Sequence, residues 1–304
     1  MEIFREFNTN KNLSLALGFF DGMHIGHCCV VKNAVKFAKE NNIRSAVITF
    51  ENSPKSFFSK TDEKTLLSIE NRLEKISKLG VDYIYVVPFT ERLASLCASE
   101  YISDVLVKNF SPRAITTGFN HTFGKDRQGA EFLRANQDKF NYKYYEIPPI
   151  TFCNQLVSTS EIKTAIEDND FEKAKNLLGY YFSISGEVIE GQKIGRTINY
   201  PTANILYPTG ITDISRGVYC GFAIIDDRPY KGILNYGVKP TVTNKNKEIL
   251  EFNIFNFNHD IYGKTIKIIP IKKIRQEKKF ASLEELKAQL AQDKIAAQEC
   301  FRNF

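Results

Sequence analysis

Two histidines stand three residues apart in a glycine-rich segment near the start of the chain. The segment reads GFFDGMHIGH and runs from Gly18 to His27, and His24 and His27 are two of only four histidines in 304 residues. Residues at this spacing share a helix face, so both imidazoles can donate hydrogen bonds to one ligand. Phosphate suits the position, because the unpaired amides of a helix start carry partial positive charge. The alternatives are a zinc pair, which would need further Cys or His ligands, or two structural histidines.

A second set of residues is suited to metal and base chemistry. Thr202 and Asn204 lie in the sequence PTAN, and on a strand they would project to the same face with hard oxygen ligands for Mg²⁺. Glu251 lies in the apolar and amide-rich segment LEFNIF, where a lone carboxylate should be paired or functional. A partly buried glutamate suits the general base that takes a proton from a primary alcohol as phosphorus is attacked. The alternative is an ion pair between Glu251 and a lysine such as Lys231 or Lys239.

A glycine-bracketed segment precedes PTAN and could close over bound phosphates. Gly191 and Gly195 bracket it, and Lys193 and Arg196 supply positive charge. The pattern GxxxxGK[ST] occurs nowhere in the chain, which excludes the commonest phosphate cradle of kinases.

The elements that must position the first set alternate between strands and helices. Segments 13–20, 44–50, 82–89, 113–118 and 142–148 read as strands, and 25–41, 66–80 and 91–109 read as helices. This alternation predicts parallel βαβ units in an open α/β sheet. Ligands in such sheets bind beyond the carboxyl ends of the strands, where the histidine segment would lie.

The pattern changes after about residue 180. Segments 180–191, 216–226, 230–237, 250–257 and 264–271 are strand-like, with Gly, Asn and Pro between them. Ser282 and Glu285 then form a capping box ahead of a helix with Leu283, Leu286, Leu290 and Phe301. We therefore expect an α/β domain over residues 1–180 and a small antiparallel, barrel-like β domain with a terminal helix over residues 181–304.

Composition and charge limit the kinds of ligand and the cellular compartment that we expect for this protein. The formal charge is +6 with a pI near 8.8, which suits anionic ligands such as nucleotides, and no basic cluster indicates nucleic acid. The six cysteines show no CxxC pair, which favours reduced thiols and the cytoplasm. We expect no membrane association, because no apolar run approaches the roughly 20 residues that span a bilayer and the first residues lack the layout of a secretory signal. The oligomeric state stays open.

The motifs together resemble the bifunctional bacterial riboflavin kinase/FAD synthetases. In the first half, GFFDGMHIGH is similar to the signature of the HxGH nucleotidyltransferases, and TFENSPKSFF, GFNHTFGKDRQG and VSTSEIKTAI resemble further motifs of the family. In the second half the resemblance covers GRTINYPTAN, RGVYCGF, GILNYGVKPTV, the Glu251 strand, DIYGK and the segment that begins KKIRQEKKF. The matches occur in family order over essentially the whole chain.

This resemblance implies a Rossmann-like nucleotidyltransferase domain followed by a β-barrel kinase domain. It implies that ATP phosphorylates riboflavin to FMN and adenylylates FMN to FAD with release of pyrophosphate, and that Mg²⁺ accompanies ATP. By resemblance, Glu251, His24 and His27 are catalytic and Thr202 and Asn204 bind the metal. The proposed ATP and phosphate contacts are Gly18, Phe20, Asp21, Gly22, Gly26, Ser158, Thr159, Ser160, Lys163, Gly191, Gly195 and Arg196. The proposed flavin contacts are Asn120, Phe123, Arg275 and Phe280.

Four positions depart from the family pattern. Asn120 stands where the family usually has Asp, His121 replaces an aromatic residue, Lys163 replaces Arg, and Asn199 replaces Gly. Lysine keeps the positive charge of arginine and loses its bidentate fork. Simpler roles remain for some candidates: the hydroxyls of Ser158–Ser160 could only cap a helix, and Arg275 could belong to a solvated basic face.

Other functions stay open from the sequence. One half alone could be active, most plausibly the kinase, given Asn120 and Lys163. A nucleotide- or RNA-binding protein is a second possibility, because HxGH also occurs in tRNA-charging enzymes, but it would need a larger basic surface than KKIRQEKK. A flavin store is a third, and it gives no reason for PTAN beside a lone glutamate.

Overall fold

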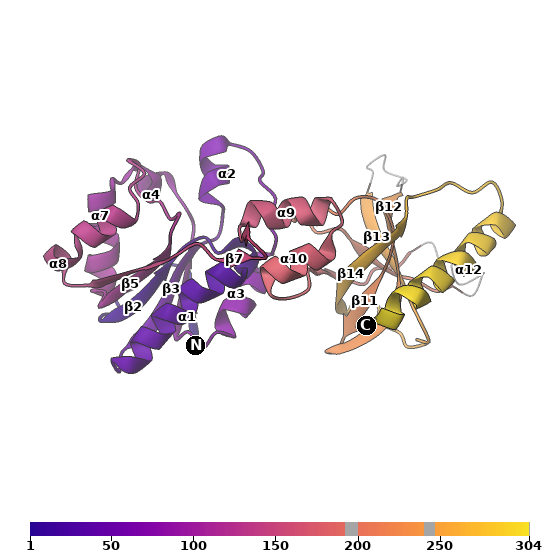
Figure 1. Ribbon diagram of the computed structural model, residues 1–304, viewed down its shortest axis with the longest axis horizontal. Coiled ribbons are helices and arrows are strands. Elements are labelled where there is room, and N and C mark those ends of the chain that lie inside the picture. Colours follow the sequence, from indigo (N-terminus) through magenta and orange to yellow (C-terminus); the bar gives the residue numbers. More distant parts are fainter. Residues whose placement is uncertain (192–199, 240–246, 304) are drawn as a thin grey trace. The chain divides into compact units, whose positions relative to one another are not determined.

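The computed structural model describes residues 1–191, 200–239 and 247–303. The chain divides into two compact units, Met1–Glu161 and Ile162–Phe304. The first is an α/β unit and the second is built on an antiparallel sheet with a terminal helix, as the sequence predicted (Figure 1).

A parallel sheet forms the centre of the first unit. Its strands are β1 (Glu2–Phe4), β2 (Leu13–Leu17), β3 (Arg44–Phe50), β4 (Tyr83–Val87), β5 (Ala114–Gly118) and β6 (Lys143–Ile147). Their order is β1-β4-β3-β2-β5-β6, and all neighbours are parallel. The chain thus runs outward from β2 through β3 and β4, and then crosses back to β5. The edge between β2 and β5 is therefore the topological switch point, where open α/β sheets bind ligands.

Side chains of β2 alternate between the two faces of this sheet. Leu15 and Leu17 join one apolar cluster with Ile102 and Phe110, and Ala16 joins the opposite cluster with residues of α1. The helical segments are η1 (Asp21–Met23), α1 (Ile25–Glu40), α2 (Pro54–Ser59), α3 (Ile69–Ser77), α4 (Glu91–Ser95), α5 (Ala98–Glu100), η2 (Tyr101–Val107), α6 (Lys108–Phe110), α7 (Ala130–Ala135) and α8 (Gln137–Phe140). Both faces of the sheet are covered, which explains why the central strands β2, β3 and β5 are largely buried, whereas the edge strands β1 and β6 are partly exposed.

The helix predicted over residues 91–109 is interrupted. Leu96 and Cys97 are extended, with ψ of 135° and 165°, so α4 ends and α5 begins anew. The loop after β5 fills the break, because the amide of Lys125 donates to the carbonyl of Leu96 and the amide of Ala98 donates to Asp126 Oδ1, both at 2.8 Å. Periodicity could not reveal this, since the partners come from a distant segment.

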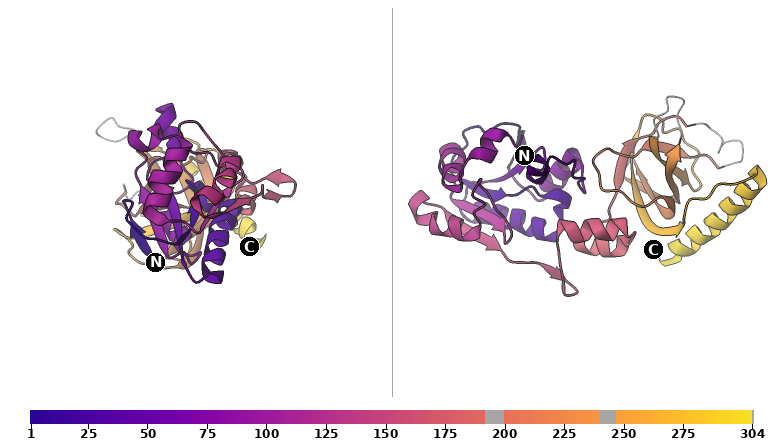
Figure 2. Two further views of the ribbon diagram at one scale, coloured as in Figure 1. Left: turned by 90° about the vertical axis from the view of Figure 1, so that its left-hand side faces the viewer. Right: turned by 90° about the horizontal axis from the view of Figure 1, so that it is seen from above.

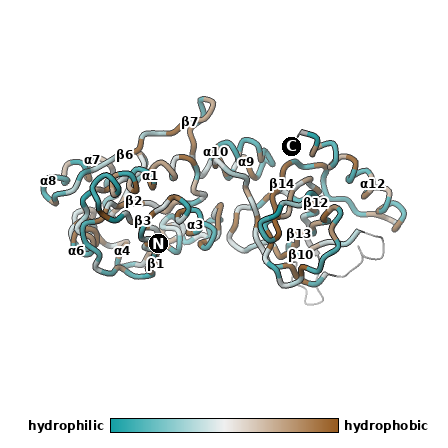
Figure 3. The backbone as a smooth tube through the Cα atoms, turned by 90° about the horizontal axis from the view of Figure 1, so that it is seen from below, coloured by the Kyte–Doolittle hydropathy of each residue, from teal (hydrophilic) through white to brown (hydrophobic). Residues whose placement is uncertain are grey.

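A small hairpin protrudes from the first unit (Figure 3). It comprises β7 (Thr151–Phe152) and β8 (Gln155–Leu156), joined by two residues with positive φ. Phe152 is 39% exposed and Leu156 is 41% exposed. Two helices follow, α9 (Thr159–Glu167) and α10 (Phe171–Leu178), and the division between the units falls within α9.

In the described part of the second unit, six antiparallel strands form a sheet that nearly closes into a barrel (Figure 2). Its strands are β9 (Ile184–Glu187), β10 (Ala203–Leu206), β11 (Gly217–Ile225), β12 (Arg228–Lys239), β13 (Lys247–Ile254) and β14 (Thr265–Arg275). Their order is β10-β13-β12-β11-β14-β9, and a bridge between Ile189 and Asn204 links the two outer ends.

Helix α12 (Leu283–Cys300) packs against β11, β12 and β14, and a short turn, η3 (Phe301–Asn303), follows it. Ser282 caps the helix as predicted, because its Oγ accepts from the amide of Glu285 at 3.1 Å. The carboxylate of Glu285 accepts from the amide of Ala281 at 3.0 Å. Phe301 is buried, whereas Leu283 is 51% exposed and lies outside the packed face.

Candidate active sites

The turn after β2 leads directly into α1 and needs unusual backbone angles. Phe20, Gly22 and Met23 all have positive φ, at 58°, 75° and 39°. A Cβ on Gly22 would lie 2.5 Å from Leu66 Cδ1, so both space and conformation require glycine there. The carboxylate of Asp21 is buried and accepts a hydrogen bond from the amide of Leu66 at 2.8 Å, and this bond fixes the position of the turn.

His24 and His27 lie against each other at the start of α1. Their ring centroids are 3.6 Å apart with planes at 21°, and Nδ1 of His24 accepts from the amide of His27 at 3.3 Å. His24 is therefore the N-cap of α1, and its proton sits on Nε2, where it can be donated to a ligand. Gly26 leaves room for this ring, since a Cβ there would lie 3.2 Å from His24 Cε1.

Both histidines are neutral at pH 7. Burial lowers the pKa of His24 to about 4. Burial also lowers the pKa of His27 well below its usual value of 6.5, the nearby His24 ring and Arg72 guanidinium lower it further, and a hydrogen bond to the Asp21 backbone acts in the opposite direction. Each neutral ring carries a single N–H, which His24 can offer to a phosphate oxygen through Nε2, and the pair does not supply fixed positive charge.

Arg72, which the sequence motifs do not include, holds the ends of two strands together. This side chain of α3 is 3% exposed and donates to the carbonyl of Phe19 at 2.8 Å and to the carbonyl of Phe50 at 2.6 Å. Its guanidinium also lies 4.3 Å from the ring centroid of Phe19. Burial lowers its pKa to about 10, so it stays charged at pH 7. The sequence held a signal, because Arg72 falls on the apolar stripe of Ile69 and Ile76.

The loop after β5 brings Asn120 and His121 to the same edge of the sheet as the histidine pair. A Cβ on Gly118 would lie 3.7 Å from Asn120 Oδ1 and 3.9 Å from Val30 of α1, so this loop packs beside α1. Asn120 is exposed. The ring of Phe123 is 8% exposed and packs among Tyr101 and Phe132, so it anchors the loop in the core.

Several buried polar atoms in the described part of the first unit lack a hydrogen-bond partner. They include Nδ1 of His27, Nε of Arg72 and Nε2 of His121. His27 and His121 follow β2 and β5, the two strands of the switch point. Buried polar atoms are normally paired, so the atoms at this edge have hydrogen-bonding capacity to offer a polar ligand.

The hydroxyls at the start of α9 have different surroundings. Ser158 caps the helix, accepting from the amide of Glu161 at 3.2 Å, which is the simpler role considered for it. Thr159 Oγ1 donates to the Asp21 carbonyl at 3.4 Å, which connects this segment to the histidine turn, and Ser160 is exposed. Lys163 belongs to the second unit.

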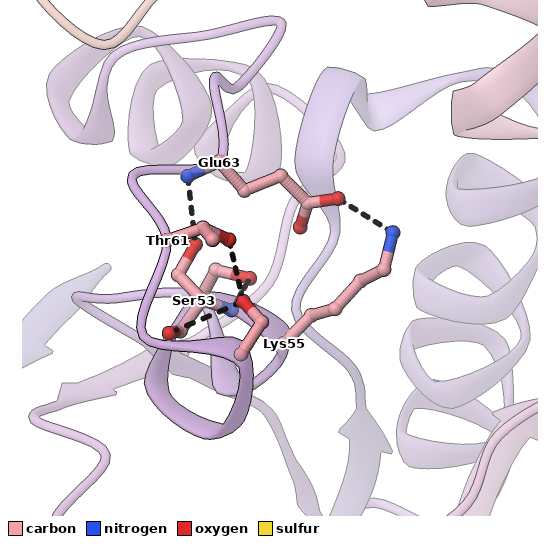
Figure 4. A network of polar contacts seen from close by, with 6 residues as sticks. Ser53, Lys55, Thr61 and Glu63 are labelled. Atoms are coloured by element: carbon pink, nitrogen blue, oxygen red, sulfur yellow. Dashed lines mark hydrogen bonds and ion pairs between the residues drawn. The ribbon is translucent and has the colours of Figure 1, made fainter.

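The segment TFENSPKSFF runs from the end of β3 into α2, and polar contacts tie it to the residues that follow α2 (Figure 4). Ser53 caps α2 through the amide of Ser56, and Oγ of Ser56 accepts from the amide of Glu63 at 3.2 Å. Lys55 forms an ion pair of 2.5 Å with Glu63. These contacts order the loop that follows β3, on the same edge of the sheet.

In the second unit, neighbouring strands place Glu251 between two asparagines. Glu251 of β13 is opposite Asn204 of β10 on one side and opposite Asn235 of β12 on the other. Nδ2 of Asn235 donates to Glu251 Oε2 at 3.4 Å. Lys231, one proposed ion-pair partner, has its ammonium 5.1 Å from the ring centroid of Phe301, and the side chain of Lys239 lies outside the described residues. Asn235 was not singled out, although GILNYG contains it.

Thr202 and Asn204 lie beside Glu251, on the segment that leads into and forms β10. Asn204 is 5% exposed, and its Nδ2 donates to the carbonyl of Thr202 at 3.3 Å. A Cβ on Gly191 would lie 2.5 Å from Asn204 Nδ2, so the missing side chain makes room for the amide. Asn253 fixes the approach to the strand by donating to the carbonyl of Pro201 at 2.8 Å. Gly195 and Arg196, and also Lys193 and Asn199, lie outside the described residues.

Arg275 is not part of a solvated basic face. Its Nε and one terminal nitrogen donate to the two carboxylate oxygens of Asp293 on α12, each at 2.8 Å, and Asp293 is 1% exposed. The guanidinium carbon lies 5.7 Å from the ring centroid of Phe280. Asp293 was not predicted as a site residue, although it interrupts the apolar stripe formed by Leu286, Leu290 and Ala297.

These residues line one cavity of about 600 Å³ within the second unit. Its walls include Thr202, Asn204, Asn235, Glu251, Arg275 and Phe280, and also the side chains of Leu286 and Leu290. Among the described residues, no group of three His, Cys, Asp or Glu side chains gathers as a metal site. The hydroxyl of Thr202 and the amide oxygen of Asn204 are hard oxygen donors of the kind that Mg²⁺ accepts.

The chain matches two family models, one for each unit. The model described as FAD synthetase matches residues 6–161, and the model described as riboflavin kinase matches residues 178–301. In the described part of the chain no helix has the length and apolar character to cross a membrane.

Curated relatives match over nearly the full length. The chain is 35% identical to a bifunctional riboflavin kinase/FMN adenylyltransferase of Escherichia coli strain K12, covering 94% of this chain and 92% of the relative. It is 36% identical to the protein of the same name from Bacillus subtilis strain 168, covering 95% and 92%. Among solved structures, one from Streptococcus pneumoniae named macrolide-efflux protein matches with a TM-score of 0.87 and 31% identity, covering 97% of this chain and 98% of that one.

Proposed function

The chain belongs to the family of bifunctional riboflavin kinase/FMN adenylyltransferases, and from that premise we propose how its residues divide the two reactions. The enzyme phosphorylates riboflavin to FMN and adenylylates FMN to FAD. We assign the first reaction to residues 181–304 and the second to residues 1–180. The limits of the two family matches, at residues 161 and 178, support a boundary in this region.

For the kinase reaction, Glu251 is the general base. Its carboxylate accepts the proton of the terminal ribityl hydroxyl as that oxygen attacks the γ-phosphorus of ATP in line, and ADP leaves. Asn235 supports this role, because its amide donates to Oε2 and so orients the carboxylate. The observation that carries the assignment is the register that sets Glu251 beside Asn204 at the wall of the cavity.

Thr202 and Asn204 are the proposed ligands of Mg²⁺. The fit is supported by the space that Gly191 leaves around the Asn204 amide and by the hard oxygen donors of both side chains. When bound, the ion would neutralise charge on the ATP phosphates. Gly195 and Arg196 complete the proposed phosphate contacts from the sequence.

Arg275 and Phe280 are the proposed flavin contacts of the kinase cavity. Asp293 holds the guanidinium in one orientation through two hydrogen bonds. A fixed planar guanidinium next to an aromatic ring offers flat surfaces on which a tricyclic ring can stack.

For adenylyl transfer, the ionised phosphate of FMN attacks the α-phosphorus of ATP, and pyrophosphate leaves. No nucleophilic side chain is needed, so the site has to position the reactants and stabilise the developing charge. His24 and His27 donate to phosphate oxygens at the start of α1, with Gly18, Phe20, Asp21, Gly22 and Gly26 forming the turn. The remaining proposed contacts are Ser158, Thr159, Ser160 and Lys163 for phosphate, and Asn120 with Phe123 behind it for the flavin.

The substrates riboflavin, FMN and ATP and the products FAD and pyrophosphate follow from these reactions. We place the enzyme in the cytoplasm, which the six free thiols support. We propose neither nucleic acid nor membrane as a partner.

Chromatography of flavins tests the division of labour. Glu251→Gln should lower FMN formation from riboflavin by about 10²–10⁴-fold and leave FMN-to-FAD conversion within twofold. His27→Asn should do the reverse. Glu248→Gln is the matched control, because Glu248 lies on the same strand and pairs with exposed Arg216. Loss of both activities in either folded variant would overturn the assignment.

A further inference from the structure

Two thiols meet where α12 packs on the sheet of the second unit. Cys220 of β11 is fully buried, and its Sγ donates to the carbonyl of Lys272 at 3.6 Å. Cys300 is the last residue of α12, and it lies close enough to Cys220 to raise the pKa of that thiol. Both side chains belong to one small apolar cluster with Ala297 and Phe301.

The two thiols differ in access. Cys300 is partly exposed, whereas Cys220 is shielded by the cluster. Burial and the contact with Cys300 raise the pKa of the Cys220 thiol, so Cys220 stays protonated at neutral pH. A small oxidant in solution therefore meets Cys300 first.

We propose that Cys220 and Cys300 form an oxidisable dithiol, which reacts with a small hydroperoxide and ends as a disulfide between β11 and α12. The Cys300 thiolate attacks the terminal peroxide oxygen, the O–O bond breaks, and an alcohol or water leaves, which gives a sulfenic acid. The sulfur of Cys220 then attacks the sulfur of Cys300. The S–O bond breaks, and the departing hydroxide takes the proton of Cys220 and leaves as water. Two thiols are oxidised and one hydroperoxide is reduced.

The modification would act on the wall of the kinase cavity. Helix α12 supplies Leu286, Leu290 and Asp293 to that wall, and Asp293 holds Arg275. A covalent bond at Cys300 would fix the end of this helix to β11 without altering any proposed site residue. The dithiol is independent of the assignments made above, because its chemistry can be followed without an activity assay.

The test uses the reduced full-length chain treated with hydrogen peroxide. Proteolysis without reductant, followed by mass spectrometry, should give one peptide pair that joins Cys220 to Cys300, lighter than its two reduced parts by two hydrogen atoms. Dithiothreitol should reverse it. The linked chain should unfold several degrees higher in the transition of the second unit, because the cross-link restricts the unfolded chain.

Two variants make the result decisive. In Cys220→Ala the sulfenic acid of Cys300 should persist and be trapped by dimedone, since the thiol that resolves it is gone. Cys153→Ser, which removes an exposed thiol on the protruding hairpin, should link as the parent chain does. The proposal fails if Cys300 proceeds to sulfinic acid in the parent chain with no linked peptide, or if Cys220→Ala leaves the products at Cys300 unchanged.

Discussion

The ion pair between Arg275 and Asp293 allows a quantitative test of what holds the kinase cavity together. The side chain of Arg275 is 21% exposed and that of Asp293 is 1% exposed, so both charges are largely removed from water. Removing one partner of a buried pair leaves an uncompensated charge and typically costs about 3–5 kcal/mol. Arg275→Met should therefore destabilise the second unit by this amount, or by roughly 10 °C in its unfolding temperature.

A double-mutant cycle separates the charge pair from mere packing. Asp293→Leu alone leaves the guanidinium of Arg275 without its carboxylate partner and should also destabilise the second unit. The combination Arg275→Met/Asp293→Leu should recover most of the loss, because a buried ion pair can be replaced by apolar side chains at little cost. Arg216→Met, which breaks an exposed pair with Glu248, is the control and should cost no more than about 1 kcal/mol.

Chemical denaturation of the full chain, followed with probes in each unit, measures these effects. The riboflavin KM of the double variant then tests the proposed contact between Arg275 and the flavin. It should stay raised after stability returns, because the planar guanidinium is still missing. Additive costs in the cycle would refute the coupling, and a normal riboflavin KM in the stable double variant would refute the flavin contact of Arg275.

Three further predictions concern other parts of the sites. Burial lowers the pKa of His24 and of His121 to about 4 from 6.5. Between these pH values the unfolded chain therefore binds more protons than the folded chain. The contribution of neutral His24 to the stability of the first unit is complete above about pH 6.5 and should fall by roughly 3 kcal/mol as the pH approaches 4. Calorimetry across this range checks it, and a constant unfolding temperature would contradict it. Gly191→Ala would place a Cβ 2.5 Å from Asn204 Nδ2, so half-maximal FMN formation should need about 10-fold more Mg²⁺; an unchanged Mg²⁺ titration would count against the proposed metal site. Arg72→Met should cost the first unit about 1–3 kcal/mol for each strand-end carbonyl left unpaired and abolish FAD formation, with FMN formation as the internal control; normal FAD formation would show that the clamp is dispensable.

Local sequence pattern was enough to predict most helices and strands. The alternation of strands and helices before residue 180 and the strand-rich stretch after it correctly predicted the two fold types. The cap at Ser282 and the start of α1 after the histidine turn were also predicted, because caps and turns depend on neighbouring residues. The break at Leu96 was missed, since its hydrogen-bond partner, Lys125, lies in another segment.

The sequence by itself located the side chains that we propose for the chemistry, because HxGH, PTAN and Glu251 are recognised by residue type and short spacing. Only the tertiary structure decided which other residues these side chains contact. Asn235 reaches Glu251, Asp293 holds Arg275, and Arg72 joins the ends of β2 and β3 because strand register and helix packing bring distant segments together. Burial, which keeps the imidazoles neutral and makes the thiols of Cys220 and Cys300 unequal, is likewise a property of the folded chain.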